Sequence, residues 1–397
     1  MSRGTLAGIV VSFMTRHPSR GPDVEERSAL IHQEILKLAI LIAVAIAAFF
    51  VTRAIAASNR SMTLRDAAEW YARGERALAA GDPSVAVEAF RRANVMKRGD
   101  RQYTLALGRA LITTHQTDAA EGSLLALRES APEDPEVNLE LARLEAGRGD
   151  ATAALRYYHN ALYAPWSAEQ ADDRRNIRLE LIRFLMATHQ SGRAESELVA
   201  LTSDLPDTVA LHVEVGDMFL SIGASRRALD QFERAIALAP QDRAALAGAG
   251  RAAFSVGDYE KAQHYLPELS DAGDDVREMR ALVNLVLSGD PLAPRIGSSA
   301  RRRRLLEALS HISERLDACH PSNPGDASAG ALSQLAEETT AFEKELEHGT
   351  TLENDTIENG LDLVNRGARA VTAACPPAQT LDRALMLIAS RHGVGAP

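Results

Sequence analysis

Residues 213–240 read VEVGDMFLSIGASRRALDQFERAIALAP, and this stretch contains the pattern that decides the fold. Gly216 is followed twelve residues later by Ala228, sixteen residues later by Phe232 and, at the end of the stretch, by Pro240. A small residue allows two helix backbones to approach, and a large side chain fills the space beside it. The stretch therefore predicts two antiparallel helices joined by a short turn.

The same pattern occurs six times and repeats every 34 residues, with one interruption. The small-residue positions are Gly74, Gly108, Ala142, Ile182, Gly216 and Gly250, of which Ile182 departs from the pattern. Alanine stands twelve residues after each of them, at Ala86, Ala120, Ala154, Ala194, Ala228 and Ala262. A large apolar residue stands sixteen residues after each, at Phe90, Leu124, Tyr158, Leu198, Phe232 and Leu266. One unit cannot bury its apolar face alone, so the period predicts an all-α solenoid of stacked helix pairs.

The interruption separates the third unit from the fourth. Ala142 and Ile182 are 40 residues apart, six more than the period, and the inserted segment holds Pro165 and Trp166. We expect two runs of three units on either side of it. After the sixth unit a further first helix, at about residues 275–288, lacks a full partner, and we expect it to be a solvated cap.

This spacing of Gly, Ala, aromatic residue, Ala and Pro resembles that of the tetratricopeptide repeat family, most clearly from Val215 to Pro240. The resemblance covers roughly residues 65–290. It implies about six repeats whose concave surface binds other proteins.

An apolar segment precedes the repeats. Leu38 to Val51 is an unbroken apolar run of fourteen residues, and with its flanks it extends over residues 35–57. Twenty or so apolar residues span a membrane as a helix, and Lys37 and Arg53 near the ends can reach the headgroups. We predict a single transmembrane helix at 35–57; a buried core helix and a cleavable leader ending near Ala56 are the alternatives. Arginine and lysine near the two ends are balanced, so they leave the orientation open.

The domain boundaries can be placed from the repeats, the apolar segment and the prolines. We assign residues 1–34 to a flexible tail, 35–57 to the membrane helix, 62–290 to the solenoid and 291–397 to a C-terminal helical bundle. Coarse helices are expected in the bundle at 300–318, 329–348, 356–374 and 378–391, because prolines and glycines separate them.

The chain has two cysteines, Cys319 and Cys375, both in this bundle. An even pair confined to one module predicts a disulfide, which would place the bulk of the protein outside the cytoplasm, in a bacterial periplasm. Two buried thiols, with the bulk facing the cytoplasm, are the alternative.

The sequence shows no motif for catalysis, a cofactor or a metal. The net charge of −10 argues against general nucleic-acid binding. Arg301 to Arg304 open a helix, and because four consecutive residues surround its axis we expect a solvated helix start. Contact with an acidic partner or with lipid phosphates is the alternative.

One row of residues predicts a binding surface. The residue after the small position is Arg109, Arg143, Arg183 or Arg251 in four of the six repeats. In the family that this chain resembles, this position lines the concave groove, together with residues three before the small position, here Tyr71, Leu105 and Leu139. Arginine binds carboxylates with two hydrogen bonds, so the row favours an acidic or carboxylate-bearing protein segment as partner. Pairing of these arginines with the chain's own Glu140, Glu180 and Glu214 is the alternative.

The sequence thus predicts a membrane-tethered, non-enzymatic scaffold of a bacterial cell-envelope complex that binds proteins through an arginine-lined groove. Two further hypotheses remain: a cytoplasm-facing adaptor with the same groove, and an enzyme with its site in the C-terminal module. For the enzyme, Cys319 beside His320 would be the candidate residues, and a disulfide would remove the nucleophile.

Overall fold

We analysed a computed structural model, which describes residues 24–266, 273–319, 327–349 and 352–394. These residues contain α-helices, one short 3-10 helix and no strands. The chain divides into two compact units, residues 1–165 and 166–397, and each unit is described by itself. The division falls between Pro165 and Trp166, inside the six-residue insertion that separates the two runs of repeats.

Unit 1 consists of one long helix followed by five shorter ones. These are α1 (Val24–Ala79), α2 (Pro83–Met96), α3 (Arg101–Thr113), α4 (Thr117–Ser130), α5 (Pro135–Arg148) and α6 (Ala151–Leu162). The last turns of α1 pack on α2, α3 packs on α4 and α5 packs on α6, which gives three helix pairs.

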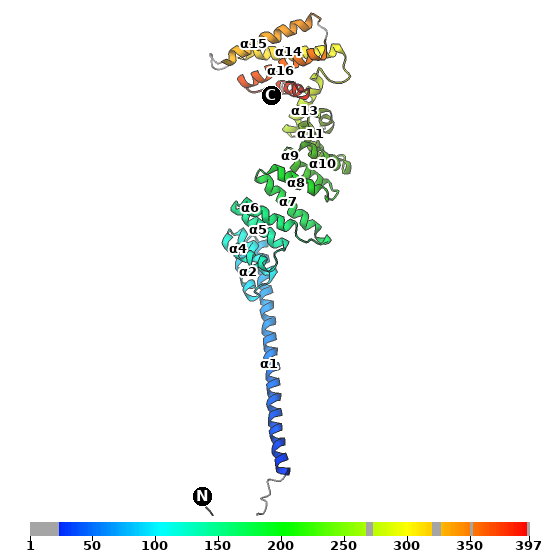
Figure 1. Cartoon of the computed structure of the whole chain (residues 1–397). Coiled ribbons are helices and arrows are strands. Elements are labelled where there is room, and N and C mark those ends of the chain that lie inside the picture. Colours follow the sequence, from blue (N-terminus) through cyan, green and yellow to red (C-terminus); the bar gives the residue numbers. More distant parts are fainter. Residues whose placement is uncertain (1–23, 267–272, 320–326, 350–351, 395–397) are drawn as a thin grey trace, which may run out of the picture. The chain divides into compact units, whose positions relative to one another are not determined.

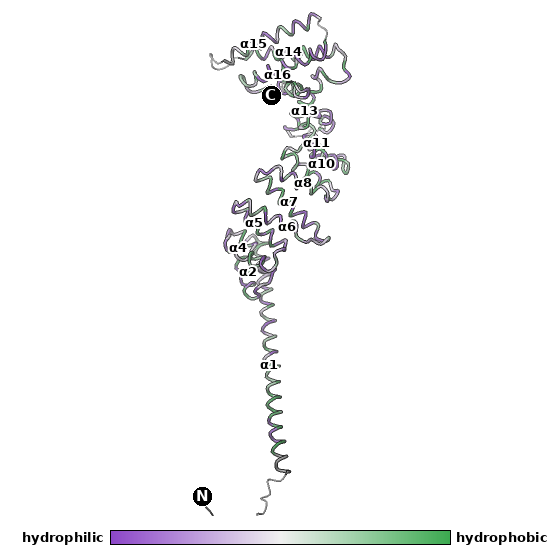
Figure 2. The backbone as a smooth tube through the Cα atoms, viewed as in Figure 1, coloured by the Kyte–Doolittle hydropathy of each residue, from purple (hydrophilic) through white to green (hydrophobic). Residues whose placement is uncertain are grey.

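Helix α1 is 56 residues long and runs without a break from the apolar segment into the first repeat (Figures 1 and 2). The expected membrane helix (35–57) and the expected start of the solenoid (62) therefore lie on one continuous helix. Residues 24–34, which we assigned to the tail, are also helical. Among the described residues, α1 contains the one helical segment long and apolar enough to cross a membrane, and this segment is not buried by the rest of the chain. Phe49 and Phe50, for example, are 59% and 61% exposed.

Unit 2 contains the other three repeats and the C-terminal helices. Its repeat helices are α7 (Ala171–Ala187), α8 (Ser191–Thr202), α9 (Val209–Ser221), α10 (Ser225–Leu238), α11 (Arg243–Ser255), α12 (Tyr259–Tyr265) and α13 (Asp274–Gly289), and a 3-10 turn (Ala168–Gln170) precedes them. Then follow α14 (Ser298–Ala318), α15 (Ala327–Glu347), α16 (Asn354–Ala374) and α17 (Thr380–Arg391). The four C-terminal helices begin and end within two residues of the ranges expected from the sequence.

The repeat pattern packs as its chemistry predicts. All six alanines of the pattern are fully buried, and so is Phe232. A Cβ atom added to Gly216 would lie 2.8 Å from the ring of Phe232, and one added to Gly108 would lie 2.8 Å from Leu124. The glycines are therefore required because the large side chain of the second helix lies against the backbone of the first.

In the turn inside each repeat, the residue seven positions after the small position has a left-handed backbone conformation, with positive φ. Glycine takes this conformation in four repeats, for example Gly149 at φ +81°. In the other two repeats the residue is His115 (φ +57°) or His189 (φ +56°). Residues with a Cβ adopt this conformation at a cost that glycine avoids.

The prediction of a solvated cap after the sixth repeat is wrong. Helix α17 packs on α13, and the ion pair between Arg391 and Glu260 (2.8 Å) joins it to α12. His392 Nε2 also lies 3.0 Å from the buried carboxylate of Asp290, at the end of α13. The C-terminal helix thus covers the end of the solenoid, and one apolar core continues from Leu179 to Ile388 across the expected boundary at 291.

The run Arg301–Arg304 is not a freely solvated helix start. Arg301 donates to Asn354 of α16 (3.1 Å), Arg302 donates to the backbone carbonyl of Leu346 at the end of α15, and Arg304 donates to that of Asp290 (2.8 Å). Because consecutive residues surround the helix axis, the run reaches three different neighbours and ties α14 to them.

Candidate protein-binding groove

A hollow of about 430 Å³ lies in unit 1 over the first two repeats. Tyr71, Leu105 and Arg109, all predicted from the repeat phase, line it. Glu75, Leu78, Arg101, Gln102, Ala106 and Glu136 complete its walls. The structure therefore brings three of the seven predicted groove residues to one surface.

Tyr71 is positioned by two other aromatic rings. Its ring stacks on Tyr103 with centroids 5.1 Å apart and lies 5.4 Å from Phe90. Burial is the main reason why the pKa of Tyr71 is raised, so its hydroxyl group is neutral near pH 7 and can donate a hydrogen bond. Leu105, by contrast, is only 3% exposed and contributes little more than an apolar floor.

Arg109 is held by two carboxylates of the neighbouring repeat. Its Nε donates to Glu140 (2.7 Å) and its Nη2 donates to Glu136 (3.0 Å). Burial lowers the pKa of Arg109, but the hydrogen bonds and charges of Glu140 and Glu136 outweigh this effect, and its pKa is raised. The guanidinium group is therefore fixed in orientation and permanently charged.

The two carboxylates differ in accessibility. The Glu140 side chain is 3% exposed, and it accepts hydrogen bonds from Arg109 and from Arg143 (2.8 Å). The Glu136 side chain is 44% exposed and faces Arg109 and Arg101 at the surface. Exposed ion pairs contribute little to stability, whereas breaking a buried one leaves an uncompensated charge. Glu136 is thus the accessible carboxylate of the two, and Glu140 is the buried one.

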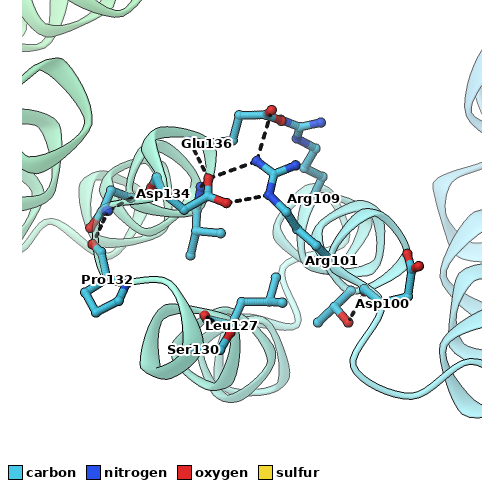
Figure 3. A network of polar contacts seen from close by, with 11 residues as sticks. Asp100, Arg101, Arg109, Leu127, Ser130, Pro132, Asp134 and Glu136 are labelled. Carbon is cyan, nitrogen blue, oxygen red and sulfur yellow. Dashed lines mark hydrogen bonds and ion pairs between the residues drawn. The ribbon is translucent and has the colours of Figure 1, made fainter. Parts of the chain in front are cut away.

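Arg101 and Asp134 complete the network, as Figure 3 shows. The Asp134 carboxylate caps α5 by accepting from the backbone N–H groups of Glu136 (3.0 Å) and Val137 (3.2 Å), and it also accepts a hydrogen bond from Arg101 Nη2 (2.9 Å). Burial acts to raise the pKa of Asp134, but Arg101 and these backbone groups outweigh it, and the pKa is lowered. Neither Arg101 nor Glu136 was predicted as a groove residue. The Asp-Pro pair at 134–135, a helix start, was the available sequence signal.

The remaining predicted groove residues lie elsewhere. Leu139 is 8% exposed and belongs mainly to the core. In unit 2, Arg183 pairs with Glu214 (2.5 Å), and Arg251 lies 3.9 Å from both Asp217 and Asp275. The sequence left two roles open for the four arginines, and the structure pairs all of them with the chain's own acids, including the expected Glu140 and Glu214.

Cys319 and Cys375 form a disulfide, with Cα atoms 5.8 Å apart. Neither sulfur is a free thiolate, so the hypothesis of a C-terminal cysteine enzyme loses its nucleophile. His320, its expected partner, lies outside the described residues. Within the part of the chain that the structure describes, no group of three or more His, Cys, Asp or Glu side chains is arranged to hold a metal ion.

The comparisons with known proteins agree with the repeat architecture. The family model described as "Tetratricopeptide repeat" matches residues 105–169 and 216–276. These segments contain most of the second repeat, the third repeat, most of the fifth repeat and the sixth repeat. Both matched segments of the chain are thus tetratricopeptide repeats. No curated protein sequence matches the chain.

Several solved structures are similar to the chain. A tetratricopeptide repeat protein from Parabacteroides merdae is 13% identical, with 70% of this chain and 99% of that chain covered and a TM-score of 0.38. PilF of Pseudomonas aeruginosa is 14% identical, with 56% and 99% covered and a TM-score of 0.40. Part of a repeat protein from Cytophaga hutchinsonii is 11% identical, with 79% and 99% covered and a TM-score of 0.40. These similarities do not indicate a partner or a pathway.

Proposed function

We propose that this protein is a membrane-tethered scaffold of a bacterial cell-envelope complex, which binds an acidic protein segment in the hollow over its first two repeats. The observation that carries the proposal is the arrangement around Arg109. Buried Glu140 fixes the guanidinium group through Nε, while the outer nitrogen Nη2 is occupied by the exposed carboxylate of Glu136. A partner carboxylate can take the place of Glu136 without leaving a buried charge unpaired.

The ligand that fits this hollow combines an acid with apolar side chains. Tyr71, Leu78 and Leu105 provide the apolar contacts, and Arg101 and Arg109 provide the charge. Because Glu75 and Glu136 also line the hollow, a highly acidic segment would be repelled. One or two carboxylates flanked by apolar residues suit it best.

Helix α1 would be the membrane tether. The apolar residues 35–57 would measure about 34 Å at 1.5 Å per residue, enough to cross the roughly 30 Å hydrocarbon core. Ala67 is the first fully buried residue of the repeats, and the nine helical residues between it and Ala57 extend over about 14 Å. The first repeat, which carries the hollow, would therefore lie close to the membrane surface.

The disulfide supports a location of the bulk outside the cytoplasm, because stable disulfides persist in oxidising compartments. A membrane-impermeant thiol reagent tests this. After reduction, both cysteines should be labelled in spheroplasts as strongly as in lysed cells. Labelling that requires lysis would instead support the cytoplasm-facing adaptor.

Photo-crosslinking in the native membrane tests the binding function. A photoreactive residue at Gln102, which lines the hollow, should capture a defined protein. The same residue at exposed Glu88, which is on α2 and does not line the hollow, should not capture it. Arg109→Gln should abolish the product. Equal capture from both positions, or capture that does not depend on Arg109, would contradict the proposal.

A further inference from the structure

A second pocket, of about 600 Å³, lies in unit 2 at the insertion that interrupts the repeats. It is formed by the segment after Pro165, the first turns of α7 and the end of α8. The residues that define its chemistry are Trp166, Arg174, Arg175, Arg178, Leu201 and Asp204. Three positive charges thus lie beside an aromatic and an aliphatic wall.

Two of these arginines have a buried Nε without a hydrogen-bond acceptor, although Arg178 forms an ion pair with Glu197. Across the described parts of the chain, the Arg174 side chain makes no ion pair or hydrogen bond, and its Nε is buried without an acceptor. The Arg178 side chain is 10% exposed, and its Nε lies 3.4 Å from Glu197 Oε2 without forming a hydrogen bond. Buried donors are nearly always satisfied in folded proteins, and the described residues supply no acceptor for Arg174 Nε.

The two acids near the pocket, Asp172 and Asp204, do not pair with Arg174, so a ligand could supply its acceptor. Arg175 pairs with Asp172 (2.7 Å), whose side chain is 82% exposed. Asp204 also lines the pocket and is exposed, but it does not pair with Arg174. Asp204 would repel further negative charges on a ligand. A ligand with a single carboxylate beside an apolar group therefore fits the pocket best.

The pocket is distinct from the arginine row predicted from the repeat phase. Arg174 and Arg178 are one turn apart on α7 and share a face. Arg183 follows Arg174 by nine residues, about two and a half turns, so it points to the opposite side of the helix. No other repeat has the insertion that supplies Trp166.

We propose that this pocket binds a carboxylate of a peptide, with the acid on Arg174 and an adjacent apolar side chain against Trp166 and Leu201. A guanidinium group accepts a carboxylate through two hydrogen bonds, and the indole ring supplies a large apolar surface. The pocket volume suits two or three residues of an extended peptide. The carboxylate can come from an acidic side chain or from a chain terminus, which present the same chemistry.

The chain provides its own reporter for this site. Trp70 and Trp166 are its two tryptophans, so the full-length Trp70→Phe protein in detergent reports on Trp166 alone. We would titrate it with three acetylated peptides: Leu-Asp-Leu amide, Leu-Leu with a free C-terminal carboxylate, and Leu-Asn-Leu amide. At least one acidic peptide should change the fluorescence of Trp166, and the neutral amide should not. The stronger of the two acidic peptides identifies the source of the carboxylate.

Matched variants complete the test. Arg174→Gln should weaken binding of the acidic peptide about tenfold or more, because a charged hydrogen-bonding partner is lost. Asp204→Asn should strengthen it, and Arg226→Gln, at an exposed position of α10, should leave it unchanged. Arg174 is partly exposed, so the variant should fold normally, which circular dichroism checks. No response to either acidic peptide, or equal binding of all three peptides, would overturn the proposal; loss of the Arg109-dependent crosslink would not affect it.

Discussion

The two units share one packing pattern but hold their arginines differently. In unit 1, Arg109 and Arg101 form ion pairs with Glu136, Glu140 and Asp134. In unit 2, Arg174 has no partner among the described residues and lines a pocket. The comparison shows that the repeat period determines how the helices pack, whereas the residues outside the pattern determine what each surface can bind.

The units also differ in how the chain closes their open ends. The first repeat helix of unit 1 is the continuation of the long apolar helix α1, and the last repeat helix of unit 2, α13, is covered by α17. The disulfide joins the end of α14 to the end of α16, shortly before α17. The end of the repeats in unit 2 is thus covered by another helix, whereas the first repeat helix of unit 1 continues into the apolar segment.

The largest expected effect comes from the buried phenylalanines. Phe90 and Phe232 are both 0% exposed and lie against glycines of the first helices. Phe232→Ala should destabilise unit 2 by about 3–5 kcal/mol, and Phe90→Ala should do the same to unit 1. Hydrogen exchange should show faster exchange only within the mutated unit. Equal loss of protection in both units would show that they unfold together.

Reduction of the disulfide should affect unit 2 alone. The bond closes a loop between residues 56 positions apart, for which the chain-entropy model gives about 4 kcal/mol. We expect reductant to lower the protection of α14, α16 and α17 and to leave α2 to α6 unchanged. The double variant Cys319→Ala, Cys375→Ala should show the same exchange with and without reductant.

Asp134 should contribute to the stability of unit 1 in a pH-dependent way. Its lowered pKa means that the contribution is complete above the ordinary carboxyl pKa of about 4 and is lost as pH falls through the lowered value. Asp134→Asn should cost about 1–2 kcal/mol at pH 7, because the cap is weakened and the ion pair is lost. Urea unfolding in the Trp166→Phe background, in which Trp70 reports on unit 1, measures this. The difference in stability that the Asp134→Asn substitution causes should shrink below a pH of about 4, and a constant difference would contradict the assignment.

The smallest expected effect allows a direct comparison of equivalent turns. His115→Gly in unit 1 and His189→Gly in unit 2 should each stabilise their unit by about 1 kcal/mol, because both residues have positive φ. Urea unfolding followed by Trp70 for the first and by Trp166 for the second provides the readout. A loss of stability would indicate that the histidine side chains make compensating contacts.

Most of the fold could be predicted from the sequence because each position of the repeat pattern has a packing role that its residue type reveals. The buried alanines and the glycines against Phe232 and Leu124 occur where the 34-residue period places them. The covering of α13 by α17 could not be predicted, since the two helices are nearly a hundred residues apart and no periodic signal links them. The continuity of α1 could not be predicted either, because the mostly polar residues 58–66 are compatible with either a linker or a solvated helix.

The candidate site was predictable only in outline. The phase of the repeats located Tyr71, Leu105 and Arg109, because residues at equivalent helix positions face the same side. It could not show that Glu136 and Glu140 would differ so strongly in exposure, since that depends on the packing of α5 against α3. The proposed exchange of Glu136 for a partner carboxylate depends on that difference.

The most direct test of the central claim compares two substitutions beside Arg109. With the photoreactive residue at Gln102 in native membranes, Glu136→Gln removes the internal competitor and should increase the yield of the crosslinked partner severalfold. Arg109→Gln should abolish it, and Glu121→Gln, a partly exposed acid that does not line the hollow, should leave it unchanged. We thus predict a higher crosslinking yield for Glu136→Gln and a loss of crosslinking for Arg109→Gln. Equal yields for the Glu136→Gln and Arg109→Gln proteins would contradict this prediction.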